Sequence, residues 1–143
     1  METGLLHTHR LLAYLFLLAA LSTIALAVHG LLTHRSVQKN DQWAVRLTVI
    51  TAHIQLLLGL GLYFVGPWFS QLLSDPAEVM KTAELRWFSV EHIFVNLVGV
   101  VLITIGSAKF KRSSGAQSFK TMVVYIGLGL LLIASRVPFD RLF

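Results

Sequence analysis

The chain has 143 residues, of which 55% are hydrophobic and 13% are charged. Soluble globular domains carry about 25% charged residues, so this composition indicates an integral membrane protein. The formal net charge of +5 is modest, and the basic residues lie between apolar runs, where lipid headgroups explain them without a nucleic-acid partner. The absence of cysteine excludes disulfides, iron–sulfur clusters and covalent haem attachment through C-x-x-C-H.

Four apolar runs without Asp, Glu, Lys or Arg indicate four membrane-spanning helices: Leu11–Leu32, Leu47–Ser74, His92–Ala108 and Thr121–Ser135. Because lipid offers the backbone no hydrogen bonds, such runs should be helical. The fourth is shorter than the roughly 17–25 residues of a usual span, so we expect Val137 and Phe139 to lengthen it while Arg136 reaches toward the headgroups. The predicted helices cover residues 6–32, 44–70, 87–108 and 119–136 of a single all-α domain, 1–143, a four-helix transmembrane bundle.

The first run also has features of a secretory signal peptide, since Arg10 precedes it and Ala25-Leu26-Ala27 mimics a cleavage site. Its apolar stretch is long for a signal peptide, and Val28 would make a poor mature N-terminus. We therefore expect residues 6–32 to remain as the first span.

Basic residues in the loops predict an orientation. Seven lysines and arginines lie on the side of the loops 34–46 and 109–120, and five lie on the side of both termini. The positive-inside rule therefore predicts an up-down-up-down bundle with both termini on the outer, periplasmic side of a bacterial inner membrane. Between spans two and three, Ser74-Asp75-Pro76 is typical of a helix start, which predicts a surface helix or an extension of span three.

Histidines within or at the ends of the runs are the candidate functional residues. An ionisable side chain inside a span is costly and marks a functional site, and histidine is a common axial ligand of haem. With a helical rise of about 1.5 Å per residue, His9 and His92 lie at similar depths near the outer surface, whereas His53 lies about two turns deeper. His29 and His34 are expected to form only hydrogen bonds.

Small and polar residues at helical spacing indicate the faces that point into the bundle. His9 begins such a stripe on span one, and His92 shares a face with Asn96 on span three, whereas His53 lies to one side of the small and polar face of span two. These faces consist of Ala13, Phe16, Ala20, Thr23, Ala27 and Gly30; of Thr48, Ala52, Gln55, Gly59, Tyr63 and Gly66; and of Ser89, Gly99 and Gly106.

Five segments also carry a resemblance: Gly4–His9 (GLLHTH), His53–Tyr63 (HIQLLLGLGLY), Arg86–His92 (RWFSVEH), Val101–Gly106 (VLITIG) and Val137–Phe139 (VPF). They are similar to segments of the small four-helix membrane proteins of Bacteroidetes labelled cytochrome b, over nearly the whole chain. The resemblance implies haem b as the cofactor, with His7, His9, His53 and His92 as the candidate ligands.

The leading hypothesis is therefore an electron carrier with haem b, between a quinol and a redox partner, rather than an independent enzyme. Quinone is the second candidate cofactor. Arg10 or Arg86 would pair with the haem propionates, Asn96 would lie beside the ligands, and Glu91 would pair with Arg86 or Arg10 or relay protons.

Two alternatives stay open. The chain is small and has short loops, so it fits a non-catalytic subunit that contacts other membrane proteins through its helices. Imidazole and carboxylate ligands also suit Zn²⁺ or Cu²⁺, which predicts a metal site at the outer face. Its ligands would be His7, His9, Glu91 and His92.

Overall fold

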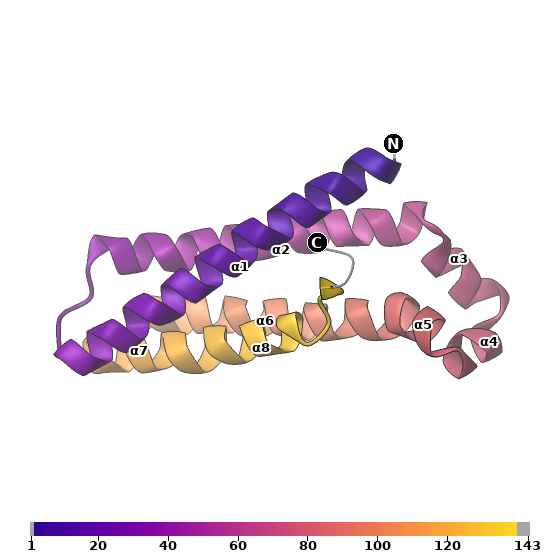
Figure 1. Ribbon diagram of the computed structural model, residues 1–143. Coiled ribbons are helices and arrows are strands. Elements are labelled where there is room, and N and C mark those ends of the chain that lie inside the picture. Colours follow the sequence, from indigo (N-terminus) through magenta and orange to yellow (C-terminus); the bar gives the residue numbers. More distant parts are fainter. Residues whose placement is uncertain (1, 140–143) are drawn as a thin grey trace.

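The computed structural model describes residues 2–139, and these residues form helices and no β-strand (Figure 1). Four helices are long and apolar enough to cross a membrane: Thr3–Thr33, Lys39–Val65, Ala83–Arg112 and Ala116–Ala134. The prediction of an all-α fold with four helices able to span a membrane is therefore confirmed. The alternating direction of the spans and the side on which the termini lie stay predictions.

The spans are continuous helices or are assembled from consecutive helical segments. Spans one and two are α1 (Glu2–Thr33) and α2 (Lys39–Val65). Three short helices follow, namely α3 (Pro67–Ser74), α4 (Pro76–Lys81) and α5 (Ala83–Arg86). Span three continues from α5 through the π-helical turn η1 (Trp87–Glu91) into α6 (His92–Arg112). Span four comprises α7 (Ala116–Thr121), the π-helical turn η2 (Met122–Ile126) and α8 (Gly127–Ala134).

The two ends of the bundle differ in their connections (Figure 1). The short connections 34–38 and 113–115 lie at one end, which we call the loop end. The helices α3, α4 and α5 lie at the opposite end, which we call the cap end. Figure 1 also shows that α1 crosses the other spans obliquely.

Local signals explain why the observed α2 differs from the predicted range 44–70. It begins earlier because the carboxylate of Asp41 accepts a hydrogen bond from the backbone N–H of Gln38 at 2.7 Å and caps the helix. It ends earlier because Gly66-Pro67 interrupts it. Proline lacks the N–H that would continue one helix and is suited to the first turn of the next, here α3.

The connection between spans two and three agrees with both predicted alternatives. Asp75 accepts a hydrogen bond from the backbone N–H of Glu78 at 3.0 Å, and a separate short helix, α4, begins at Pro76. The following segment, α5, lengthens span three, which begins at Ala83 instead of residue 87 and ends at Arg112 instead of 108. Span four covers 116–134 instead of 119–136.

Small residues let the spans approach closely. The predicted stripe of α1 faces the interior, where its members from Ala13 to Gly30 are buried. In α8, a Cβ added to Gly129 would lie 2.8 Å from the carbonyl oxygen of Gly99 and 2.6 Å from Cγ1 of Ile103. Lipid tails are as apolar as leucine, so helices in a membrane are stabilised mainly by close packing. The crossing of α6 and α8 therefore requires glycine.

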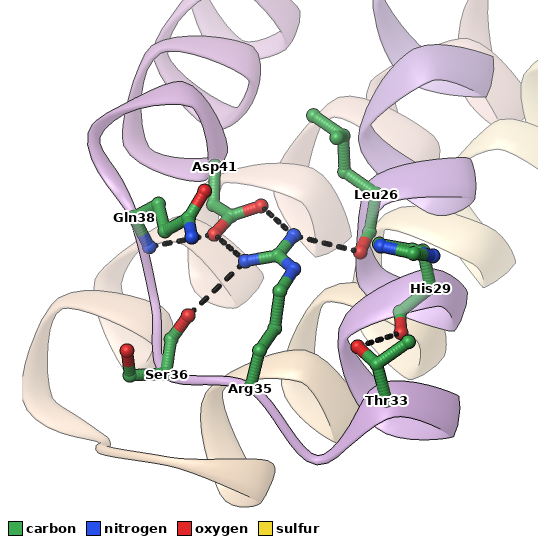
Figure 2. A network of polar contacts seen from close by, with 7 residues as sticks. All are labelled: Leu26, His29, Thr33, Arg35, Ser36, Gln38 and Asp41. Carbon is green, nitrogen blue, oxygen red and sulfur yellow. Dashed lines mark hydrogen bonds and ion pairs between the residues drawn. The ribbon is translucent and has the colours of Figure 1, made fainter.

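A buried ion pair fixes the loop end (Figure 2). Two nitrogens of Arg35 donate to the two carboxylate oxygens of Asp41 at 2.7 and 2.8 Å, and the side chain of Asp41 is fully buried. Arg35 also donates to the carbonyls of Ser36 and Leu26 and lies 5.0 Å from the ring centre of Phe119. The hydrogen bond to Asp41 raises the pKa of Arg35. One bidentate pair thus joins α1, α2 and α7.

Replacing Gly129 with alanine tests the contact between α6 and α8. The added methyl group would meet the backbone of Gly99, so we expect a loss of about 1–3 kcal/mol in the free energy of unfolding. Gly61→Ala is the matched control, because nothing lies within 4 Å of its added Cβ. Unfolding by SDS, followed by circular dichroism, measures both. Equal stability of the two variants would contradict the tight contact.

Candidate cofactor-binding cavity

A cavity of about 360 Å³ lies within the bundle toward the cap end. Its walls come from the N-terminal half of α1, the C-terminal half of α2, the start of α6 and the residues around the end of α8. The wall is mainly apolar and includes Trp68 and Phe88, whose rings stack 4.7 Å apart. Ligand sites commonly measure 300–1,000 Å³ and combine apolar walls with a few polar groups. Here the polar side chains are His9, Arg10, Gln55, Tyr63, His92 and Asn96.

The ring of His9 lies against α2. Its Nε2 is 3.1 Å from the amide nitrogen of Gln55. Because an amide nitrogen can only donate, Nε2 accepts and the proton lies on Nδ1, which is buried and has no hydrogen-bond partner in the described chain. A Cβ added to Gly59 would lie 3.1 Å from Cε1 of His9, so glycine at this position gives the imidazole its room.

His92 enters the cavity directly after the π-helical turn η1. Its backbone N–H donates to the carbonyl of Trp87, five residues earlier, and such turns are frequent at functional sites. The ring Nδ1 lies 2.6 Å from the carbonyl oxygen of Arg136, so Nδ1 carries the proton and donates it. The lone pair of the imidazole is therefore on Nε2. Histidines that bind metals usually donate their other ring N–H in this way.

A charged network lies beside the cavity at the cap end. The carboxylate of Glu91 contacts Arg86 at 2.9 Å and Arg136 at 3.4 Å. The predicted pairing of Glu91 with Arg86 is thus confirmed, and the second partner is Arg136 rather than Arg10. Arg10 lines the cavity and forms no ion pair or hydrogen bond with any residue of 2–139. Its guanidinium is available to an anionic group.

Three buried polar atoms in the cavity wall have no hydrogen-bond partner within the described residues: His9 Nδ1, Gln55 Oε1 and Asn96 Oδ1. Each unmatched buried group costs about 1–3 kcal/mol, so native proteins seldom tolerate several together. These three atoms make the cavity wall a candidate binding site.

The structure separates His53 from this cavity. His53 is exposed near the midpoint of α2, and its Nδ1 donates to the carbonyl of Val49 at 2.7 Å. Its Nε2 lies 3.3 Å from the hydroxyl of Thr104 on α6. His53 therefore faces outward between two spans rather than toward His9 and His92.

The other histidines also lie outside the cavity. His7 and His29 are exposed on α1, and His34 lies in the connection 34–38 with φ 52. Among residues 2–139, no three His, Asp or Glu side chains gather so that they could hold a metal ion. Of the predicted site residues, the cavity unites His9, His92, Arg10 and Asn96, with Glu91 and Arg86 in the adjacent ion pair.

Gln55, Tyr63 and the carbonyl of Arg136 are not among the site residues predicted from the sequence. Gln55 and Tyr63 shared the small and polar face of span two with Gly59, and that pattern was the available signal. The carbonyl of Arg136 had no signal, because a backbone group leaves no pattern in the sequence.

No protein-family model, curated protein or solved structure matches this chain.

Removing the hydroxyl of Tyr63 tests how the cavity wall is held. This hydroxyl donates to the carbonyl of Ser89 in η1 at 2.9 Å and joins α2 to the turn that precedes His92. Hydrogen bonds between spans average about 0.6 kcal/mol and reach about 1.7, so Tyr63→Phe should lower the free energy of unfolding by that order. Tyr125→Phe is the control, since its hydroxyl has no hydrogen-bond partner among the described residues. A loss of the same size in both variants would refute the role of this bond.

Proposed function

We propose that this protein binds haem b in the cavity and carries electrons, and that His9 and His92 would hold the haem iron. One observation supports this proposal above all. Two imidazoles from different spans line the same apolar cavity, and His92 has its Nδ1–H fixed by a backbone carbonyl, which leaves Nε2 free to bind iron.

The residues of the cavity fit such a group. A haem ligated by two histidines needs two imidazoles, apolar walls and cations for its propionates, and the cavity offers each of these. Trp68 and Phe88 supply flat aromatic surface, and the guanidinium of Arg10 forms no ion pair or hydrogen bond with any residue of 2–139. In the structure, the amide of Gln55 donates a hydrogen bond to Nε2 of His9. This bond would break when haem binds, so that Nε2 could bind the iron.

Haem would supply reversible one-electron chemistry, and the protein's own residues would orient it and control its surroundings. His9 of α1 and His92 of α6 would hold it in the cavity. The apolar walls would exclude water and thereby set its potential, as would the hydrogen bond from His92 to Arg136. Arg10 would bind a carboxylate at the cap end.

The proposal extends to the setting of the protein. The basic loops favour a bacterial inner membrane with both termini and the cap end on the periplasmic side, and four spans that alternate in direction. The cavity would then lie in the outer half of the membrane. The electron donor that we propose is a quinol, and the acceptor is a redox protein at the outer surface.

Titration of the purified full chain with haemin tests this function. We expect a Soret band and a low-spin spectrum typical of two histidine ligands. His9→Ala and His92→Ala should each weaken haem binding about tenfold or more and remove the low-spin signal. His53→Ala is the control and should bind haem as the unchanged chain does. The absence of a Soret shift, or unchanged spectra of both cavity variants, would refute the proposal.

The position of His53 favours a second function, as a subunit of a larger membrane complex. An ionisable side chain on the exposed surface of a span is costly, and such residues almost always face protein. The single hydrogen of the Thr104 hydroxyl is donated to the carbonyl of Val100 at 2.8 Å, so Nε2 of His53 keeps a lone pair. We propose that a helix of another subunit donates a hydrogen bond there.

Mild detergent extraction from the host membrane, followed by native gel electrophoresis, tests the second function. The unchanged chain should migrate in a complex of defined size, and His53→Leu should release it as a single chain. His29→Leu, which changes an exposed histidine elsewhere, should leave the complex intact. Migration of the unchanged chain as a lone species would exclude this role, whatever the outcome of the haem titration.

A further inference from the structure

A second hollow, of about 460 Å³, opens at the loop end, far along the bundle from His9 and His92. It lies between the connection 34–38, the start of α2, the end of α6 and the connection 113–115. All four spans begin or end at this end of the bundle, at Thr33, Lys39, Arg112 and Ala116. The hollow is therefore at the level where the membrane meets water, whichever side that is.

Two cations from different spans line this hollow, Arg46 of α2 and Lys111 of α6. Neither forms an ion pair or hydrogen bond with a described residue, and no acidic side chain lines the hollow. The guanidinium of Arg46 lies 5.3 Å from the ring centre of Trp43, which restricts its position. Uncompensated positive charge in a recess of low dielectric attracts an anion.

The remaining wall suits a phosphate group on an apolar molecule. Ser114 and Gln42 add a hydroxyl and an amide group, which donate hydrogen bonds to phosphate oxygens. The buried side chains of Val45 and Phe110 also line the hollow. A lining that combines polar and apolar side chains matches a lipid headgroup and the first part of its acyl chains.

The wall is also preformed. Asp41 lies one turn before Val45, but its carboxylate is buried and neutralised by Arg35, so it does not cancel the charge of the hollow (Figure 2). On the opposite side, the hydroxyl of Ser113 lies 3.1 Å from both the carbonyl of Phe110 and the hydroxyl of Ser118. These bonds hold both connections in place without a ligand.

We propose that this hollow binds the phosphate headgroup of an anionic membrane phospholipid. Basic pockets between spans at the membrane surface recognise such headgroups. Arg46 and Lys111 contact the phosphate, Ser114 and Gln42 donate hydrogen bonds to its oxygens, and Val45 and Phe110 contact the adjoining chain. This site is independent of the haem proposal, because it shares no residue with the cavity at the cap end.

Native mass spectrometry of the full chain with phosphatidylglycerol or phosphatidylcholine tests the site. The chain should retain the anionic lipid preferentially, and the double variant Arg46→Ala/Lys111→Ala should bind it roughly thirtyfold more weakly. The matched control, Lys39→Ala/Lys120→Ala, removes the same charge at the same end from residues outside the hollow. This control should keep at least most of the preference for phosphatidylglycerol over phosphatidylcholine.

Three outcomes would overturn the proposal. The first is a double variant that keeps the lipid preference of the unchanged chain. The second is a control variant that loses as much of the preference as the double variant, which would show general attraction to positive charge. The third is displacement of the lipid by inorganic phosphate, which would show a site for the free anion. Circular dichroism without lipid establishes that both variants are folded, so weak binding reports on the hollow itself.

Discussion

Close contact between helix backbones is the constraint on which the rest of this bundle depends. In lipid, apolar side chains gain little by leaving their solvent, so the spans associate where small residues allow close approach. Gly99 and Gly129 bring α6 and α8 together, and the stripe from Ala13 to Gly30 does the same for α1. Nearer the N-terminal end of α1, His9 lines the cavity instead.

The polar groups at the two ends of the bundle differ in how many hydrogen bonds they form with other described residues. We interpret the completed network as structural and the incomplete one as part of the proposed binding site. At the loop end, Arg35 and Asp41 satisfy each other, and deeper in the bundle the hydroxyls of Thr23 and Thr48 lie 2.9 Å apart. Around the cavity, the ring Nδ1 of His9 and the amide oxygen of Asn96 are buried and have no hydrogen-bond partner among residues 2–139. Because buried polar groups in native proteins are usually paired, the proposed haem is placed in this cavity and not at the loop end.

Sequence periodicity predicted most of the site, because a span in lipid has a regular geometry. His9 and His92 were placed at similar depths and on inward faces, and both line the cavity. His53 was predicted as a ligand because it lies within a span and because its segment carries the family resemblance. Its position beside the small and polar face of span two already indicated a different direction, and the structure places it on the exposed surface.

Composition and apolar run length by themselves determined the helical class, the four spans and the identity of their interior faces, since each follows from neighbouring residues and the fixed rise and turn of a helix. Only the tertiary structure decided which groups meet across the chain. The carbonyl of Arg136 accepts a hydrogen bond from His92, 44 positions away in the sequence, and Gln55 donates one to His9, 46 positions away. Glu91 pairs with Arg136 as its second partner instead of Arg10. Such pairings depend on how the spans cross, and no local pattern records that angle.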